Sequence, residues 1–171
     1  MQKETSTIKK EYSTAYIDAA NIEKGLRDLG WDLDLSKFKI FLHHKFNCNR
    51  FIYFTGKINK DEYYQNLVTL GYEIIFKESI KIGNKIKANC DVDLSHNMTL
   101  NIERGLEENI ILCSGDGDFS ILHDFAKTKN VGFSVVSACI QTCSYLLRKR
   151  NMKIYFLDIK KETLQKRAIS D

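Results

Sequence analysis

The stretch ILCSGDGDFS, residues 111–120, decides how the rest of the chain is interpreted. An apolar run that ends at Cys113 breaks into Ser-Gly-Asp-Gly-Asp, and an amphipathic stretch begins at Phe119. This order predicts a buried strand, a tight turn and the start of a helix. The turn carries Asp116 and Asp118 at the carboxyl end of the strand, the edge where open α/β sheets bind ligands. Its glycines allow a sharp turn and leave room for a metal or phosphate close to the backbone.

Apolar runs and amphipathic stretches alternate over the whole chain. The expected strands are 13–17, 50–55, 72–77, 110–114, 132–137 and a weaker 153–157, and the expected helices include 60–70, 94–107, 119–129 and 140–149. Residues 78–89 are Lys-rich with no sustained period, which predicts an exposed loop or a short hairpin. Alternating strands and helices indicate an α/β fold, with a central, mostly parallel sheet of five or six strands.

Length and charge suggest one domain with two polar ends. A chain of 171 residues with 43% hydrophobic content is typical of one globular domain. We expect a flexible arm over residues 1–12, the domain over 13–159 and a basic tail over 160–171. Residues 148–171 hold eight basic and three acidic side chains, a charge of +5. Because the whole chain carries +4, residues 1–147 sum to about −1. Such an end is either solubilising or attracted to a phosphate backbone.

Cysteine usage and hydropathy bear on the compartment. The five cysteines form no Cys-x-x-Cys pair, and their odd number favours a reducing environment and ordinary buried thiols. The N-terminal residues lack the apolar core of a signal peptide, and no run approaches the ~20 apolar residues of a membrane span. We therefore expect a cytoplasmic protein that does not contact membranes.

Carboxylates follow two strands and begin one helix. Asp18 follows the first strand, Asp91 and Asp93 begin the helix before residues 110–114, and Asp116 and Asp118 follow that strand. Clustered carboxylates repel unless a divalent cation lies between them, and Mg²⁺ takes a few carboxylates plus water or phosphate. Asp91, Asp93 and Asp118 are also compatible with helix capping. Asp116 is the strongest candidate ligand, because a plain turn does not need a second acid two residues on.

Basic side chains are the candidates for contact with phosphate groups. Lys85 and Lys87 precede Asp91 and are suited to substrate phosphates or to a solvated loop. A second basic group with a neighbouring aromatic ring comprises Tyr145, Arg148, Lys149 and Arg150. It is suited to stacking on and steering a nucleic-acid strand, or to an inert surface. His96 lies one turn after Asp93, where it is either a surface residue or a general acid or base.

Three segments together resemble the NYN domain, the LabA-like, PIN-related ribonucleases. They are AYIDAANI (15–22), KANCDVDLSHNMTL (87–100) and ILCSGDGDFSILHDFAKTKNVGFSVVS (111–137). The family pattern is Asp-x-x-Asn after the first strand, a Lys followed by a Val-Asp-Val-like segment, and Ser-Gly-Asp-x-Asp-Phe. The resemblance spans about residues 14–158 and implies a PIN-like three-layer sandwich with helices on both faces. It also implies RNA cleavage that depends on Mg²⁺ or Mn²⁺.

The resemblance assigns roles to individual residues. It implies that Asp18, Asp91, Asp116 and Asp118 are the catalytic and metal-binding acids, with Asn21 and Ser114 in support. Family members often carry a further Asp where this chain has Asn97. Asn binds a cation or holds a water but adds no charge, so metal affinity is expected to be lower unless Asp93 compensates.

Two function hypotheses follow. The first is a metal-dependent ribonuclease, which we expect to be an endoribonuclease and to act as a monomer or homodimer. The second is a PIN-like domain that binds RNA or a protein partner without cutting. The intact acids favour the first hypothesis and Asn97 favours the second.

Overall fold

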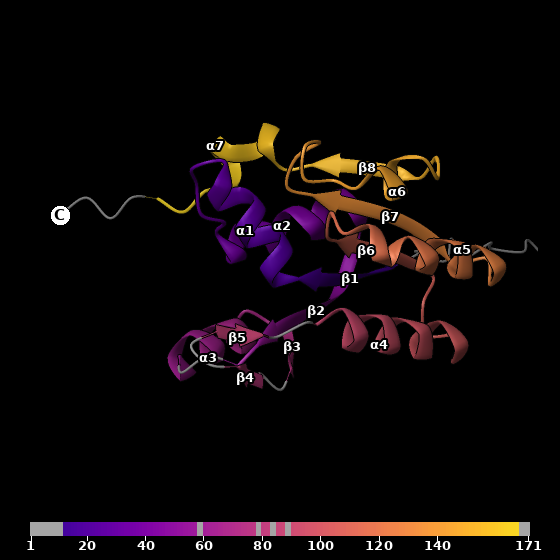
Figure 1. Ribbon diagram of the computed structural model, residues 1–171, viewed down its shortest axis with the longest axis horizontal. Helices are drawn as coiled ribbons and strands as arrows, with labels where there is room; N and C mark the ends of the chain where they lie inside the picture. The colour runs from indigo at the N-terminus through magenta and orange to yellow at the C-terminus, as the bar shows by residue number, and fades with distance from the viewer. Residues whose placement is uncertain (1–11, 58–59, 78–79, 83–84, 88–89, 168–171) are drawn as a thin grey trace, which may run out of the picture.

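The computed structural model describes residues 12–57, 60–77, 80–82, 85–87 and 90–167 (Figure 1). The strands are β1 (Ser13–Asp18), β2 (Cys48–Gly56), β3 (Glu73–Lys77), β4 (Ile80–Ile82), β5 (Lys85–Lys87), β6 (Asn109–Cys113), β7 (Gly132–Ser137) and β8 (Lys153–Phe156). The helices are α1 (Ala19–Asp28), α2 (Leu35–Phe46), α3 (Asp61–Thr69), α4 (Asp91–Glu103), α5 (Ser120–Thr128), α6 (Tyr145–Arg148) and α7 (Lys161–Leu164). Two short 3₁₀ turns are η1 (Gly117–Phe119) and η2 (Asp158–Lys160).

Six strands form one sheet in the order β3-β2-β1-β6-β7-β8, and every neighbouring pair is parallel. The predicted α/β class is therefore confirmed. The weak strand expected at residues 153–157 is β8, the edge strand beside β7. Because all six strands run the same way, their carboxyl ends meet at one edge, and the turns after β1 and β6 become neighbours.

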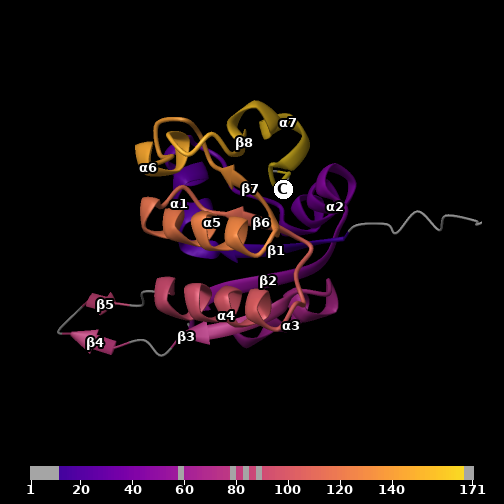
Figure 2. The same ribbon diagram turned by 90° about the vertical axis from the view of Figure 1, so that its right-hand side faces the viewer.

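Helices cover both faces of the sheet. Consecutive residues of β1 alternate between two apolar clusters, with Ala15 and Ile17 in one and Tyr16 in the other. The first cluster takes its helical residues from α1, α2, α3 and α7, including Ile22, Phe38, Leu67 and Leu164. The second takes them from α4, α5 and α6, including Leu94, Leu122 and Leu147. Figure 2 shows α5 and α6 on one side of the strands and α2 and α7 on the other, which makes three layers.

Two segments differ in detail from expectation. Residues 78–89 contain an antiparallel hairpin of β4 and β5, one of the two predicted alternatives, and it extends away from the sheet (Figure 2). The helix expected over 140–149 was wrong in its start, because α6 begins only at Tyr145. The Thr142 hydroxyl donates to the carbonyl of Cys139 at 3.3 Å, which stabilises a turn, and Ser144 then caps the helix.

The expected basic tail is partly packed on the domain. Leu164 of α7 is fully buried in the first apolar cluster. Gln165 forms an isolated antiparallel bridge with Leu33, and the Lys166 amide donates to the Asp32 carbonyl at 2.9 Å. Apart from Tyr12, the arm expected over residues 1–12 lies outside the described residues.

All five cysteines are free and buried, as their spacing predicted. Among the described residues, no helix has the length and apolarity needed to cross a membrane.

A buried polar network links β1 to the loop after α4. The Tyr16 hydroxyl donates to Glu107 Oε1 at 2.6 Å and accepts from Asn101 Nδ2 at 2.7 Å. Glu107 is 6% exposed, and its Oε2 is buried without a hydrogen-bond partner among the described residues. The Tyr16 hydroxyl is therefore one of the groups that compensate this buried carboxylate, together with the Arg50 guanidinium, which lies 4.0 Å from the same Glu107 oxygen.

We predict that Tyr16→Phe lowers the free energy of unfolding by about 1–3 kcal/mol, because it leaves buried polar groups without partners. Urea denaturation measures the loss. Tyr145→Phe, at a side chain that is 67% exposed, is the matched control and should stay within about 0.5 kcal/mol of the wild type. Equal stability of the two variants would contradict the role of the network.

Candidate functional site

Asp18 ends β1 at the carboxyl edge of the sheet and is the N-cap of α1. Its Oδ1 accepts from the Asn21 amide at 3.2 Å, and its Oδ2 accepts from the Ser114 hydroxyl at 3.1 Å. The residue is only 6% exposed. The carboxylate at the end of β1 is thus held by the first turn of α1 and by the turn that follows β6.

Asn21 and Ser114 join the turn after β1 to the turn after β6. Asn21 Oδ1 accepts from the Gly115 amide at 2.8 Å, and Ser114 Oγ accepts from the Asp116 amide at 3.2 Å. Asp18, not Asn21, caps α1, so the Asn21 side chain is used to hold the opposite turn. Both supporting residues predicted from the sequence therefore lie beside Asp18.

Asp116 caps η1, because its Oδ1 accepts from the Asp118 amide at 3.0 Å. Capping by Asp118 was the sequence alternative; the structure gives this role to Asp116 and leaves Asp118 exposed. One Asp116 oxygen is engaged in this turn. Asp116 is thus both a structural cap and a carboxylate at the edge.

Three of the acids interact electrostatically. The pKa of Asp18 is raised from 3.8 to about 6: burial is the largest cause and the nearby carboxylates of Asp91 and Asp116 add to it, while the hydrogen bonds from Asn21 and Ser114 oppose it. The cause is desolvation of the charged form together with repulsion between like charges. This edge of the sheet therefore concentrates negative charge without a described cation to balance it at Asp18.

A shallow groove of about 410 Å³ runs between α4 and η1 and is lined in part by Asp91, His96 and Asp118. Asp91 and Asp93 both lie in the first turn of α4, whose N-cap, Cys90, makes no side-chain hydrogen bond. Negative charge in a first helical turn is favoured by the helix dipole. The groove joins Asp118 to Asp91, and Asp91 acts on Asp18, so the four predicted acids occupy one region. We call Asp18, Asp91, Asp116 and Asp118 the acidic edge.

The remaining acid and amide on α4 have other neighbours. Asp93 lies close enough to Cys90 to raise its pKa together with Asp18, although burial is the main cause. Asn97 Oδ1 accepts from Asn101 Nδ2 at 3.2 Å, so it extends the buried network of Tyr16. Neither residue lines the groove between α4 and η1.

The glycines of the acidic turn have a packing role that sequence reasoning missed. A Cβ at Gly115 would lie 2.6 Å from the Thr142 carbonyl oxygen, and one at Gly117 would lie 2.3 Å from Ser144 Oγ. The space that we expected for a metal or phosphate is therefore filled by residues 142–144. The Ser144 amide also donates to the Gly115 carbonyl at 2.8 Å, which fixes α6 beside the acidic edge. Two glycines flanking Asp116 were the available signal of close backbone packing.

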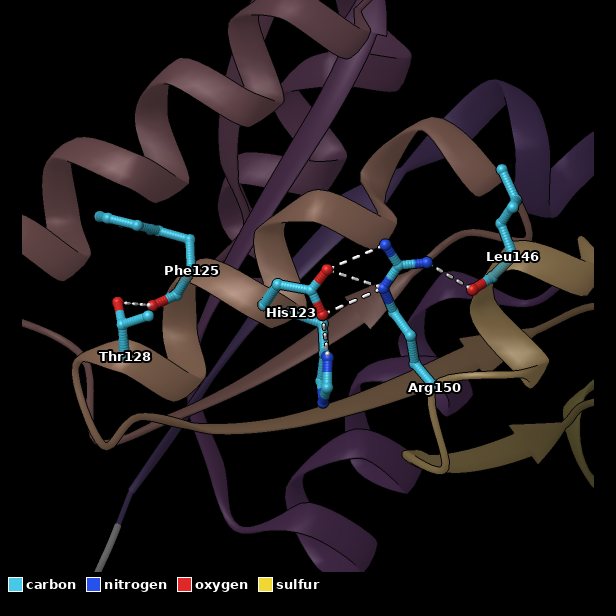
Figure 3. A network of polar contacts seen from close by, with 6 residues as sticks. His123, Phe125, Thr128, Leu146 and Arg150 are labelled. Atoms are coloured by element: carbon cyan, nitrogen blue, oxygen red, sulfur yellow. Dashed lines mark hydrogen bonds and ion pairs between the residues drawn. The ribbon is translucent and has the colours of Figure 1, made fainter.

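The basic group on α6 divides into engaged and open side chains. Arg150 forms an ion pair with Asp124 of α5 at 2.9 Å, and its Nη1 donates to the Leu146 carbonyl at 2.9 Å (Figure 3). The Lys149 ammonium lies 5.9 Å from the centre of the Tyr145 ring. Arg148 is exposed and forms no ion pair with a described residue. Arg148, Lys149 and Tyr145 are therefore the open members.

Lys85 and Lys87 lie on β5 of the projecting hairpin. Their side chains lie outside the described part of the structure. The hairpin leads directly into Asp91 of α4, so it is connected to the acidic edge through the backbone.

The acidic edge suits a hard divalent cation by the chemistry of its donors. Its ligands are all carboxylate oxygens, which favour Mg²⁺ and Mn²⁺. In the described residues, no three His, Cys, Asp or Glu side chains are close enough to hold a metal ion by themselves. Mg²⁺ is commonly bound by one or two carboxylates, with waters and substrate phosphate completing the shell. The residues fit a cation of that kind and do not form a closed protein cage.

Comparison with known proteins bears on the fold and the family. The structure is similar to the crystal structure of a protein of unknown function from Vibrio parahaemolyticus, with a TM-score of 0.76, 20% identity, and coverage of 96% of this chain and 99% of that one. At this identity the likeness shows the fold alone. No curated protein matches the chain. The pattern of the NYN domain matches residues 14–158, which is most of the sequence and includes the whole acidic edge. The chain therefore belongs to the NYN domain family, within the PIN-like superfamily.

Proposed function

We propose that this domain is a metal-dependent ribonuclease that hydrolyses RNA phosphodiester bonds at the acidic edge. The observation that carries the proposal is the buried Asp18, which is held by Asn21 and Ser114 and repelled by Asp91 and Asp116. Desolvated, crowded carboxylates are costly unless a cation offsets their charge. The NYN family is typically nuclease-like, which supports the same chemistry.

Each residue has a role that follows from its contacts. Asp18, Asp91 and Asp116 would hold Mg²⁺ or Mn²⁺, with Asp118 across the groove. A divalent cation in such a site activates water and stabilises the leaving oxygen in phosphodiester cleavage. Ser114 and Asn21 keep Asp18 and the Asp116 turn in place. Arg148 and Lys149, beside that turn, would attract the RNA backbone.

A second candidate function is an RNA-binding or protein-binding domain without cleavage. Two observations favour it: no three potential ligands in the described residues can hold a metal unaided, and Asn97 is directed to Asn101. The same experiment separates the two functions.

We predict that the purified protein cleaves RNA with Mn²⁺ or Mg²⁺ and not with EDTA, and that Asp116→Asn lowers the rate by about 100-fold or more. Loss of a metal ligand removes several kcal/mol of charge stabilisation. The substitution keeps an amide oxygen that can still cap η1. Cleavage of single-stranded and structured RNAs on denaturing gels gives the rates.

Asp28→Asn is the matched control, because Asp28 is an exposed carboxylate at the end of α1. It should cleave like the wild type. Equal cleavage by wild type and Asp116→Asn would reveal a contaminating nuclease. Metal-dependent binding without cleavage by either protein would support the second function instead.

We predict that Asp18 makes the metal-free protein less stable as pH rises from about 4 to about 6. Its pKa is about 6 in the folded state against an ordinary 3.8. The folded state therefore binds more protons than the unfolded state in this window, and stability falls with rising pH. Asp18→Asn lacks this group, so in EDTA its stability relative to the wild type should rise by up to about 3 kcal/mol between these pH values.

Urea denaturation at a series of pH values measures this difference, and Mn²⁺ should reduce it at pH 7. At ten times its dissociation constant a bound ion adds about 1.4 kcal/mol, which is about 3–6 °C in a chain of this length. Only the wild type should gain it. A pH-independent difference between the two proteins would refute the electrostatic role of Asp18.

A further inference from the structure

A second, smaller pocket lies at the same edge of the sheet, on the opposite face from the groove of the acidic edge. Its volume is about 210 Å³, and it lies between α1, α3 and the C-terminal segment. Tyr53 and Thr55 of β2 line it, and they flank Phe54, which is the register partner of Asp18. The pocket is therefore one strand away from Asp18.

Three cations from distant parts of the chain converge on this pocket. They are Arg27 of α1, Lys60 at the start of α3, and Lys166 after α7. All three side chains are exposed, and none makes an ion pair with a described residue. The backbone bond from Lys166 to Asp32 fixes the C-terminal segment at the pocket wall.

Two acidic side chains also line the pocket, so its lining carries both positive and negative charge. Asp32 and Glu23 line it together with the three cations, which leaves a formal +1. Exposed cations without ion-pair partners are suited to bind a phosphate group that remains in contact with solvent. The three cations account for binding of a phosphate, but they do not account for the carboxylate of Glu23 in the same pocket.

Glu23 has one oxygen engaged and one available. The hydroxyls of Tyr53 and Tyr63 both donate to its Oε1, the latter at 3.4 Å, and the two hydroxyls lie 3.2 Å apart. Its Oε2 accepts no hydrogen bond from a described residue. Burial raises the pKa of Tyr63 to about 12, so both tyrosines remain protonated donors at neutral pH. The free carboxylate oxygen matches the amino groups that nucleobases present, as in the pairing of Glu with cytosine N4.

We propose that this pocket binds one nucleotide of an RNA that crosses the acidic edge. The phosphate lies against Arg27, Lys60 and Lys166, and the base donates to Glu23 Oε2. The pocket is smaller than the about 300–1,000 Å³ of sites that enclose larger ligands, so it takes one base. The proposal rests on the proposed function, because it places this nucleotide next to the bond that the acids cut. It makes Glu23 a residue that determines base preference.

The phosphate contact is tested by binding alone. Fluorescein-labelled single-stranded RNA is titrated with the full-length protein in EDTA, where metal-dependent cleavage does not occur, and anisotropy is followed at several salt concentrations. Arg27→Gln and Lys166→Gln should each weaken binding by about 3–10-fold and reduce the slope of log K against log salt by about 0.7. Lys127→Gln, an exposed cation of α5 outside the pocket, is the matched control. Wild-type binding by the first two variants would overturn the phosphate site.

The base contact is tested with the four homopolymeric RNAs. Glu23→Gln should change the ratio of affinities between them by about tenfold, while Arg27→Gln weakens all four alike. Circular dichroism and urea denaturation verify that the Glu23 variant is folded. A uniform loss over all four RNAs would overturn the base contact.

Two further results separate this proposal from others. Binding of nucleoside 5′-monophosphates as tightly as RNA, with the same loss in Arg27→Gln, would identify a free-nucleotide site and overturn the RNA assignment. RNA that binds through the pocket without being cut supports the pocket and refutes the nuclease. RNA that is cut by Arg27→Gln, Lys166→Gln and Glu23→Gln with wild-type KM refutes the pocket and leaves the nuclease standing.

Discussion

The hydrogen bond between Ser114 and Asp18 joins the two halves of the site. It connects the carboxyl ends of β1 and β6, which are 96 residues apart in the chain and adjacent in the sheet. Around it, the bond from Gly115 to Asn21 and the cap formed by Asp116 set the course of both turns. Asp18 is buried as a result, and its neighbours Asp91 and Asp116 add like charge. A site with this balance stores electrostatic repulsion that a bound cation would relieve.

Much of this arrangement was predictable from the sequence, because the relevant signals are local. The run ending at Cys113 is apolar and the turn after it is abrupt, so strand, turn and helix start follow from periodicity. Parallel topology then places Asp18 and Asp116 at the same edge of the sheet, whereas the strand order that makes β1 and β6 neighbours is known only from the structure. The helix start at Tyr145 was not predictable, since the bond from Ser144 to Gly115 that positions it is a tertiary contact. The same holds for the pairing of Arg150 with Asp124 across 26 residues.

The C-terminal segment shows a second limit of local reasoning. Leu164 is a single apolar residue among charged and polar neighbours, which by composition resembles a solvated tail. Its full burial in the first apolar cluster depends on contact with α2, which lies more than a hundred residues earlier in the chain. That burial, together with the bridge from Gln165 to Leu33, holds part of the basic C-terminal segment against the domain. Part of the basic end, for which the sequence left solubilisation and phosphate attraction both open, therefore has a fixed position relative to the acids.

The packing of Gly115 and Gly117 against residues 142–144 has a mechanical consequence. The loop between β7 and α6 packs closely on the turn that carries Asp116, with the Thr142 carbonyl against Gly115 and the Ser144 side chain against Gly117. This packing therefore fixes the distance between the exposed cations Arg148 and Lys149 and the acidic edge. A change in the length of the loop between β7 and α6 would alter this distance even if no acidic or basic residue were replaced.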